Sequence, residues 1–358
     1  MSRIRAAVCR TFNAPLVIEE LEMAPPEAGE VEVTLKACAV CHSDIAFAEG
    51  AWGGRLPAVY GHEAAGEVTG LGEGVTGVAI GDRVIVTLIK SCGSCPSCGA
   101  GLPAICSGSS NSAPLTSDED EKVHRAMYCG AFAEKTVVHA SQIARIPDAL
   151  DYDVASLLSC GVITGVGAVV NAAKLRPGED AVVIGAGGVG LNAIQGARLA
   201  GAGRIVAVDL VAEKLDDAKA FGATHGVLAS EGDPAEAVKE ILGKGADAVF
   251  VTVGATAVFN AAPDYLAPGG RVVLVGIPPS GETATYAPDI ISSAGQSLIG
   301  TKMGDTVLAR DIPWLTEMYL QGRLQLDELI SKRWSLDQIN EAIADTKTGA
   351  ARRNVIVF

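Results

Sequence analysis

The chain has 358 residues, which is enough for two domains and a large hydrophobic core. Its net charge of −14 and its pI near 4.8 argue against nucleic acid or an anionic membrane as a partner. The N-terminal residues lack the apolar stretch of a signal peptide, and the most apolar segment, 154–170, is too short and too rich in glycine for a membrane span. Nine cysteines without an export signal indicate a reducing compartment and metal binding, so we expect a cytoplasmic protein.

Short apolar runs separated by turns fill the first third of the chain. These runs are Arg5–Val8, Glu30–Ala37, Ala64–Val68, Arg83–Val86 and Gly130–Val138. Strands this short, without a long helical period, predict a partly closed antiparallel barrel. The acidic segment 117–121 is interpreted as a solvated loop, with a lid over a cleft as the alternative.

The pattern changes near residues 175–180, where strand-like and helical runs begin to alternate. The expected strands are Ala181–Ile184, Ile205–Val208, Ala248–Val253, Val272–Val275 and Ser297–Gly300, and the expected helices are Val189–Ala200, Ala212–Phe221, Pro234–Leu242 and Thr256–Leu266. This alternation is typical of a parallel, doubly wound α/β sheet. The tail predicts helices at Ile312–Gln321 and Leu336–Asp345 and a last strand at Asn354–Phe358.

Four cysteines follow one another at short spacings, Cys92-x2-Cys95-x2-Cys98-x7-Cys106, with glycines between them. This spacing lets a loop surround one tetrahedral zinc ion with four thiolates. Because all four positions are protein ligands, the role is structural and contributes on the order of 10 kcal/mol to folding.

A second possible zinc site comprises Cys41, His62 and Cys160. Three such ligands leave one position open, which is the arrangement of a catalytic site. Glu63 follows His62 directly in the sequence. Cys38 and Cys41 also form a Cys-x-x-Cys, but without a surrounding thioredoxin-like pattern we interpret Cys38 as a strand residue, with a redox pair as the alternative.

The motif Gly185-Ala186-Gly187-Gly188-Val189-Gly190 follows an apolar strand and opens an apolar helix, which favours dinucleotide binding. Gly185 permits the tight turn, Gly187 admits the pyrophosphate, and Gly190 lets the helix pack on its strand. Asp209 ends the second strand, nineteen positions after Gly190. A carboxylate there accepts from both ribose hydroxyls and repels a 2′-phosphate, so NAD is favoured over NADP.

The combination of Cys-x-x-Asp at 41–44, Gly-His-Glu at 61–63 and an isolated cysteine before the glycine motif resembles the zinc-dependent medium-chain alcohol dehydrogenases. The resemblance runs from 31–44 to the terminal 353–358. It implies a Rossmann cofactor domain at 162–301. It also implies a mainly β, GroES-like catalytic domain formed by 1–161 and 302–358, with a zinc lobe at about 91–107.

The same resemblance implies roles for single residues near the catalytic zinc. Asp44 would orient His62, Glu63 would lie behind the metal and bind it transiently, and Ser43 would accept the proton of the alcohol. Trp52 and Leu88 would form part of the substrate pocket.

Further residues are implied as cofactor contacts: His42 and Arg353 at the pyrophosphate, Lys214 at the adenosine ribose, and Thr164, Val189 and Val275 at or near the nicotinamide. Ala46 stands where many members carry a relay histidine. The proton would therefore leave through ordered water, or through His42.

The implied activity is reversible transfer of a hydride between a primary or secondary alcohol and NAD, in a homodimer or homotetramer paired through 297–301. One alternative is oxidation of a thiol–aldehyde adduct such as S-hydroxymethyl glutathione. Another is a zinc-stabilised NAD-binding protein without turnover.

Overall fold

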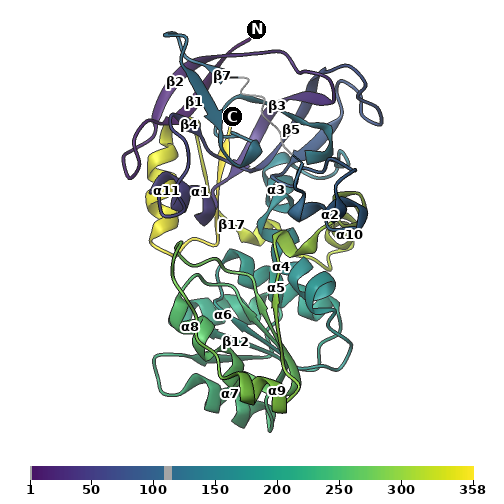
Figure 1. Ribbon diagram of the computed structural model, residues 1–358, viewed down its shortest axis with the longest axis vertical. Coiled ribbons are helices and arrows are strands. Elements are labelled where there is room, and N and C mark those ends of the chain that lie inside the picture. The colour runs from purple at the N-terminus through teal and green to yellow at the C-terminus, as the bar shows by residue number, and fades with distance from the viewer. Residues whose placement is uncertain (1, 109–114) are drawn as a thin grey trace. The chain divides into compact units, whose positions relative to one another are not determined.

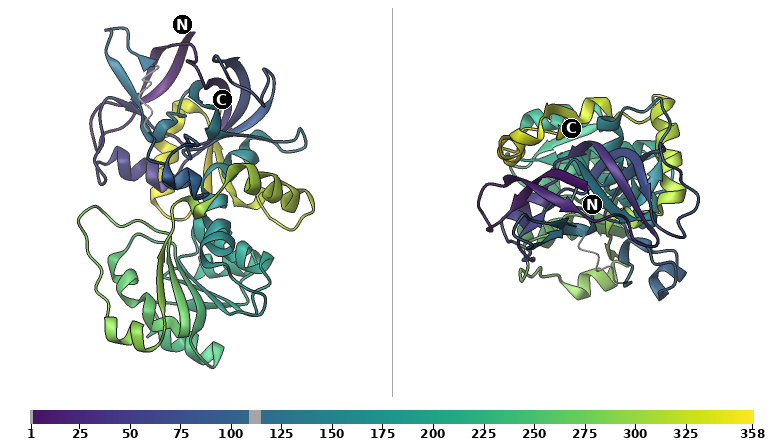
Figure 2. Two further views of the ribbon diagram at one scale, coloured as in Figure 1. Left: turned by 45° about the vertical axis from the view of Figure 1, so that its right-hand side comes forward. Right: turned by 90° about the horizontal axis from the view of Figure 1, so that it is seen from above.

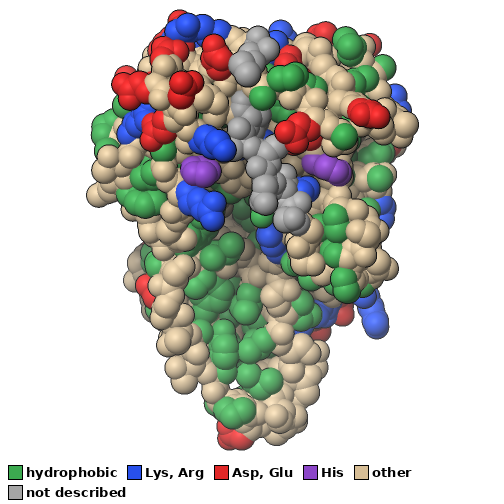
Figure 3. Space-filling model, turned by 45° about the horizontal axis from the view of Figure 1, so that its top comes forward, with side chains coloured by type: hydrophobic (Ala, Val, Ile, Leu, Met, Phe, Trp, Pro, Cys, Tyr) green, Lys and Arg blue, Asp and Glu red, His purple; other side chains and the backbone are tan. Residues whose placement is uncertain are grey.

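The structure, a computed structural model, describes residues 2–108 and 115–358. Its internal contacts divide the chain into a first unit, 1–160 with 307–358, and a second unit, 161–306 (Figure 1). Figure 3 shows acidic and basic side chains intermixed on the face of the first unit that it views.

The first unit contains a small closed barrel and a larger sheet. The barrel strands, in order, are β1 (Ser2–Cys9), β2 (Val17–Met23), β7 (Leu115–Thr116), β8 (Lys122–Arg125) and β4 (Ala58–Val59). The sheet strands are β10 (Ile143–Arg145), β6 (Arg83–Val86), β5 (Glu63–Leu71), β3 (Glu30–Ala39), β18 (Arg353–Val357) and β17 (Ile330–Trp334), with β9 (Lys135–His139) also paired to β3. Fully buried side chains such as Leu21, Val33 and Phe132 fill the core of this unit. The expected mainly β, GroES-like domain is confirmed.

The last strand returns to the N-terminal part of the chain. β18 pairs antiparallel with β3, with Val355 opposite Ala39 and Val357 opposite Ala37. β9 pairs with the other end of β3, where His139 lies opposite Glu30. The first unit is therefore discontinuous in sequence.

Five α-helices of the first unit lie around these strands: α1 (His42–Ala48), α2 (Pro96–Gly99), α3 (Tyr152–Ser156), α10 (Leu308–Leu320) and α11 (Ile339–Lys347). The acidic segment 117–121 forms the connection between β7 and β8, where the Ser117 hydroxyl accepts from the amides of Glu119 and Glu121. The interpretation of this segment as a loop agrees with these contacts, and the alternative of a lid stays a prediction.

The second unit is a parallel sheet with helices on both sides (Figure 2, left). Its strands lie in the order β13 (His225–Leu228), β12 (Ile205–Asp209), β11 (Ala181–Ile184), β14 (Ala246–Val251), β15 (Leu266–Leu274) and β16 (Ser297–Gly300). The helices are α4 (Gly161–Gly167), α5 (Gly188–Leu199), α6 (Ala212–Ala220), α7 (Pro234–Leu242), α8 (Thr256–Ala261) and α9 (Pro288–Ser293). The strand order reverses between β11 and β14, which is where ligands bind in open α/β sheets.

Both domain boundaries differ from the prediction. The second unit begins at Gly161 and ends at Thr306, not at 162 and 301. The segment 302–306 belongs to it because Thr306 donates to the carbonyl oxygen of Ile163 at 3.3 Å, and a Cβ at Gly167 would lie 2.4 Å from the carbonyl oxygen of Gly304.

The expected strand 130–138 begins only at Lys135. Met127, Tyr128 and Gly130 have φ angles of 51°, 60° and 61°, so the chain turns just before the expected strand and at its first residue. The expected helix 256–266 is α-helical only to Ala261 and continues as a 3₁₀ turn over 262–265. Within the described residues, no single helix is long and apolar enough to cross a membrane, while one bent pair of helical segments, 152–159 and 161–173, passes by length and composition only.

Candidate active site

Four buried side chains of the first unit converge at one point. The ligand atoms of Cys41, His62, Glu63 and Cys160 all lie within 4.8 Å of one another. Cys41 caps α1 just after β3, and His62 directly precedes β5, the neighbour of β3 in the sheet. Two parts of the chain that are distant in sequence are thus brought together by strand pairing.

Two further residues hold this cluster in place: Gly61, which the sequence analysis named only as part of the Gly-His-Glu motif, and Ser159, which it did not single out. Gly61 has φ +90°, and a Cβ there would lie 2.6 Å from the amide nitrogen of Phe132, so only glycine fits before His62. The Ser159 hydroxyl donates to the carbonyl oxygen of Ala64 at 2.9 Å and fixes the turn that carries Cys160. The position of Gly61 directly before a candidate metal ligand was a signal in the sequence, whereas nothing in the sequence pointed to Ser159.

Asp44 determines the orientation of the His62 ring. Its Oδ1 lies 3.0 Å from Nδ1 of His62 and also accepts from the amide of Gly61 at 2.8 Å, while Oδ2 accepts from the amide of Cys41 at 3.2 Å. Nδ1 is therefore the donor, and Nε2 is left as a buried atom with no hydrogen-bond partner among the described residues. An acceptor nitrogen directed at two thiols fits a zinc ion, which all three groups would ligate.

The electrostatics of the cluster favour a positive charge. Burial by itself lowers the pKa of His62, but the Asp44 carboxylate and Cys41 raise it well above its ordinary value. A hydrogen bond with Cys160 lowers the pKa of Cys41, and the same hydrogen bond, with burial, raises the pKa of Cys160. A metal cation would supply the charge that these groups favour.

Glu63 and Arg353 face each other beside the cluster. Burial raises the pKa of Glu63 to about 8, although the positive charge of Arg353 opposes the shift. The Arg353 Nη2 atom lies 3.5 Å from Oε1 of Glu63, and in the part of the chain that the structure describes both Glu63 oxygens are buried without a hydrogen-bond partner. Sequence analysis paired Arg353 with a pyrophosphate and did not place it against Glu63; the pyrophosphate contact stays a prediction.

The first turn of α1 carries Ser43, which is half-buried, and His42, which is exposed. Trp52 meets Phe47 edge to face at 5.1 Å, and Phe47 stacks on Tyr60 at 6.4 Å. Leu88 packs against the barrel core. The substrate-pocket role of Trp52 and Leu88 stays a prediction.

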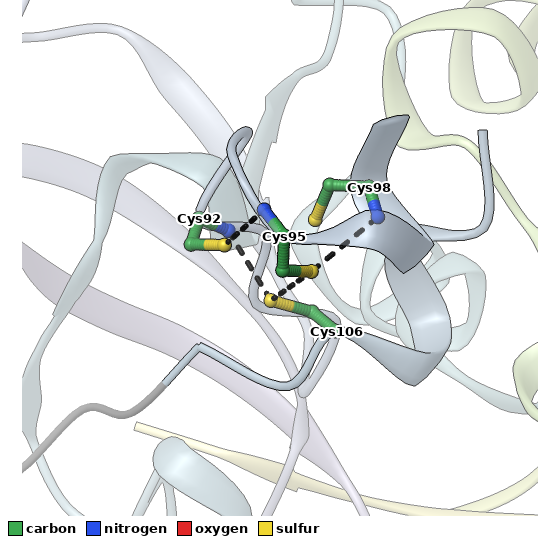
Figure 4. Close-up of side chains that lie close together, drawn as sticks. All are labelled: Cys92, Cys95, Cys98 and Cys106. Atoms are coloured by element: carbon green, nitrogen blue, oxygen red, sulfur yellow. Dashed lines mark hydrogen bonds between the residues drawn. The ribbon is translucent and has the colours of Figure 1, made fainter. Parts of the chain in front are cut away.

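A second cluster joins Cys92, Cys95, Cys98 and Cys106, whose sulfur atoms also lie within 4.8 Å of one another (Figure 4). The Cys95 and Cys106 sulfurs are 3.9 Å apart, close to the roughly 3.8 Å edge of a tetrahedron with zinc–sulfur bonds of about 2.3 Å. Backbone amides donate to these sulfurs, including Cys95 N to Cys92 at 3.3 Å and Cys98 N to Cys95 at 3.4 Å. Such hydrogen bonds lower the pKa of Cys95 to about 5 and of Cys92 to about 7, so the donor set fits a thiolate-bound metal.

The glycine motif lies between β11 and α5 of the second unit. Gly185 has φ +96°, and a Cβ there would lie 2.4 Å from Val253 Cγ1. A Cβ at Gly190 would lie 1.8 Å from the carbonyl oxygen of Gly185, whereas one at Gly187 would meet no atom of the described residues within 4 Å. The space beside Gly187, at the N-terminus of a 12-residue helix, fits a phosphate group.

Asp209 ends β12 beside this loop. Its Oδ2 accepts from the amide of Ala186 at 2.7 Å, and its Oδ1 accepts from Val211 at 3.0 Å. The strand end and the glycine motif are therefore held together by one carboxylate, a link that sequence analysis did not anticipate.

The other predicted cofactor residues of this unit occupy separate elements. Gly188 and Val189 form the first turn of α5, Lys214 lies half-buried in α6, and Val275 is buried just after β15. Thr164 of α4 lies 3.8 Å from the sulfur of Met303. Their contacts with a cofactor stay predictions.

Comparison with known families and proteins agrees with this architecture. Residues 27–148 match the alcohol dehydrogenase GroES-like domain, and residues 188–320 match the zinc-binding dehydrogenase family. The NDMA-dependent alcohol dehydrogenase of Amycolatopsis methanolica is 34% identical over 99% of both chains.

Two solved structures resemble the whole chain. An alcohol dehydrogenase zinc-binding domain protein from Burkholderia ambifaria superposes with a TM-score of 0.96 at 33% identity, covering 100% of this chain and 99% of the other. The benzyl alcohol dehydrogenase of Acinetobacter calcoaceticus gives a TM-score of 0.94 at 31% identity, with 100% of both chains covered. The chain belongs to the zinc-type medium-chain alcohol dehydrogenase family.

Proposed function

We propose that the protein is a zinc- and NAD-dependent oxidoreductase that interconverts a primary or secondary alcohol and the corresponding aldehyde or ketone. The observation that carries this proposal is the buried cluster of Cys41, His62 and Cys160, in which Nε2 of His62 has no hydrogen-bond partner within residues 2–108 and 115–358. The alcohol dehydrogenases among the relatives support the reaction class.

Cys41, His62 and Cys160 would hold the catalytic zinc, with Glu63 as a transient fourth ligand. Bound zinc supplies Lewis acidity that makes an alcohol hydroxyl more acidic, and bound NAD accepts the hydride. Asp44 keeps the Nε2 atom of His62 directed at the metal position, and Ser43, at the start of α1, accepts the proton of the alcohol. The nearby guanidinium of Arg353 favours the ionised form of Glu63 and so supports its role as a ligand.

The four-cysteine cluster would hold a second zinc ion with a structural role. Its sulfur spacing and its amide donors support this assignment. Loss of this metal should cost stability first and activity second.

The second unit would bind NAD. The open space beside Gly187 would admit the pyrophosphate, and the Asp209 carboxylate at the strand end would bind the ribose hydroxyls and repel a 2′-phosphate. Val189 and Thr164 would lie near the nicotinamide, and Lys214 near the adenosine ribose.

Aromatic or medium-length aliphatic alcohols are the proposed substrates. The related benzyl alcohol dehydrogenase supports the aromatic class. Near the active-site helix α1, the contact of Phe47 with Trp52 provides flat apolar surface of the kind that stacks with rings.

We also propose a cytoplasmic homodimer or homotetramer. β16 is an edge strand of the six-stranded sheet, so its outer edge is open to pairing with a second copy. Sedimentation at micromolar concentration tests this, and a stable monomer would contradict it.

The test of the function is NADH formation against a panel of benzylic and aliphatic alcohols, with and without glutathione and with and without NDMA, alongside metal analysis. We expect two zinc ions per chain and turnover of free alcohols without glutathione. Cys160→Ala should lose one metal and nearly all turnover while keeping the fold, and Cys95→Ala should mainly lose stability. Turnover that requires glutathione would replace the proposal with the thiol-adduct reaction, and NAD binding without turnover of any alcohol would refute an enzyme.

A further inference from the structure

Cys98 differs from the other cysteines of its cluster in the group that donates to its sulfur. Backbone amides donate to the sulfurs of Cys92, Cys95 and Cys106 at 3.3–3.4 Å. At Cys98 the neighbour is a side chain, because the Ser91 hydroxyl lies 3.2 Å from its Sγ. When Cys98 is a thiolate the hydroxyl must be the donor, since a thiolate has no proton to give.

Ser91 is in turn held by a residue of a distant segment. Its backbone amide donates to the Ser141 hydroxyl at 2.9 Å. Ser141 lies in the connection between β9 and β10, fifty positions further along the chain. The Cys98 sulfur is thus connected to the main sheet through two serines.

His139 at the end of β9 fixes the direction of these hydrogen bonds. Its Nδ1 lies 2.8 Å from the Ser141 hydroxyl and accepts from the Ser141 amide at 3.2 Å. Nδ1 therefore carries no proton, and the Ser141 hydroxyl donates to it. A lone pair of the Ser141 oxygen then faces the Ser91 amide, as the 2.9 Å contact requires.

The support behind these serines is rigid. The amide of His139 donates to Gln142 Oε1 at 3.2 Å, and Gln142 Nε2 donates to the carbonyl oxygens of Thr87 at 3.0 Å and Tyr128 at 3.2 Å. Gln142 is 1% exposed. The connection that carries Ser141 is therefore fixed to the segment that follows β6.

We propose that Ser91 and Ser141 act as positioning residues for the metal of the four-cysteine cluster: they hold the Cys98 sulfur in its ligating position and so slow the release of the metal. This inference rests on the proposed structural zinc. Groups that hydrogen-bond to metal ligands commonly change metal affinity by about 10- to 100-fold when they are replaced. The two serines also connect the four-cysteine cluster to the larger sheet. A variant that loses the metal faster should therefore also hold the segment 91–107 less firmly against that sheet.

A Cys160→Ala background isolates the cluster, because it should retain one metal ion per chain. In this background we compare Ser91→Val with Ser91→Thr, which have similar shapes and differ in the hydroxyl. Ser91, Cys98 and Ser141 line a cavity of about 620 Å³, which leaves space for the added methyl groups. Ser94→Ala is the matched control, because Ser94 also donates to a cluster sulfur, Cys92, at 3.7 Å but is exposed.

The measurements are the rate of zinc release to a colorimetric chelator and the cadmium–thiolate absorption of the cadmium-loaded protein. Ser91→Val should release zinc about 10- to 100-fold faster than the background and alter the absorption, while Ser91→Thr should restore slow release. Ser141→Ala should release it about fivefold faster, as expected for loss of one ordinary hydrogen bond. Ser94→Ala should change the rate by less than about twofold, because exposed contacts contribute little.

Equal release rates for Ser91→Val, Ser91→Thr and Ser94→Ala would overturn the proposed bridge. A Cys160→Ala protein that retains no metal would instead refute the structural zinc itself. The two failures are therefore distinguishable before any serine is replaced.

Discussion

Nδ1 of His62 lies 3.0 Å from Oδ1 of Asp44, and the two side chains are 0% and 1% exposed. A carboxylate buried to this degree needs compensation, and it receives hydrogen bonds from the amides of Gly61 and Cys41 as well. Asp44 therefore fixes three positions of the cluster at once: the His62 ring, the turn before it, and the start of the helix that follows Cys41.

Asp44→Asn should weaken zinc binding at the cluster by about 10- to 100-fold while the protein still folds. The amide keeps the size of the side chain and one acceptor oxygen, but it loses the charge that favours a positively charged neighbour. Zinc affinity measured by competition with a chelator checks this, with the exposed Asp216→Asn as control. Equal affinities in the two variants would contradict the role of Asp44.

Gly187→Ala and Gly190→Ala should fail in different ways. A Cβ at residue 187 meets no atom of the described residues within 4 Å, so the Gly187→Ala variant should fold normally. It should nevertheless lose NAD affinity, because the methyl group takes the space of the pyrophosphate. A Cβ at residue 190 would lie 1.8 Å from the Gly185 carbonyl oxygen, so that variant should lose thermal stability. Thermal unfolding and NADH fluorescence titration separate the two effects. Normal NAD affinity in Gly187→Ala would place the pyrophosphate elsewhere.

Asp209→Asn should raise the use of NADP relative to NAD, because it removes the negative charge that repels a 2′-phosphate. Asparagine keeps an acceptor for the amide of Ala186, which Asp209 binds at 2.7 Å, so the glycine loop should stay in place. Asp209→Gly removes this acceptor too, and should also lower affinity for both cofactors. The ratio of kcat/KM values for NADP and NAD measures the preference. A wild-type enzyme that uses both equally would contradict the interpretation of Asp209.

The pair Glu179 and Arg271 should make the second unit sensitive to acid. Burial by itself raises the pKa of Glu179, but the hydrogen bonds and positive charges of Arg271 and Arg176 together outweigh it and leave the pKa below its ordinary value of 4.5. A carboxyl group with a lowered pKa in the folded state stabilises the fold above pH 4.5, and this contribution is lost as the pH falls from there through the folded-state pKa.

Glu179→Gln should therefore cost on the order of 1 kcal/mol at pH 7 and almost nothing at low pH. Urea unfolding of variant and wild type at pH 7 and below pH 4 measures the difference. The exposed Glu213→Gln is the control and should change neither value. A Glu179→Gln cost that does not depend on pH would show that packing, rather than charge, accounts for it.

The four-cysteine set could be predicted because the ligands of a structural metal recur at spacings that let a short loop close around one ion. Cys160 is distant in sequence from Cys41 and His62, so its place in the catalytic set followed from the family resemblance rather than from spacing. The parallel sheet was also predictable, since Ala181–Ile184 and its neighbours are continuous apolar runs, and Ser297–Gly300 appears with the expected bounds. In the first unit, the strand Arg83–Val86 also appears with the expected bounds. The strand β2 was not predicted, because only Leu21 and Met23 are buried and the glutamates between and before them give the segment a polar sequence.

Contacts between distant segments could not be read from local pattern. Neither the approach of Arg353 to Glu63 nor the link from Asp209 to Ala186 follows from spacing along the chain. The two-serine connection from Cys98 to the β9–β10 turn is of the same kind: each serine is an ordinary loop residue until the fold places them together.

The pairing of β18 with β3 has a consequence for the order in which the protein can be assembled during synthesis. Residues 161–306 form a unit that is continuous in sequence, so the ribosome delivers all of it before the chain is finished. β3 lacks one partner until the second unit has been made, because β18, which pairs with Ala37–Ala39 just before Cys41, follows that unit in the sequence. The first unit can therefore complete its sheet only after the second unit has been synthesised, so the Ala37–Ala39 edge of β3 stays open while the second unit can already fold.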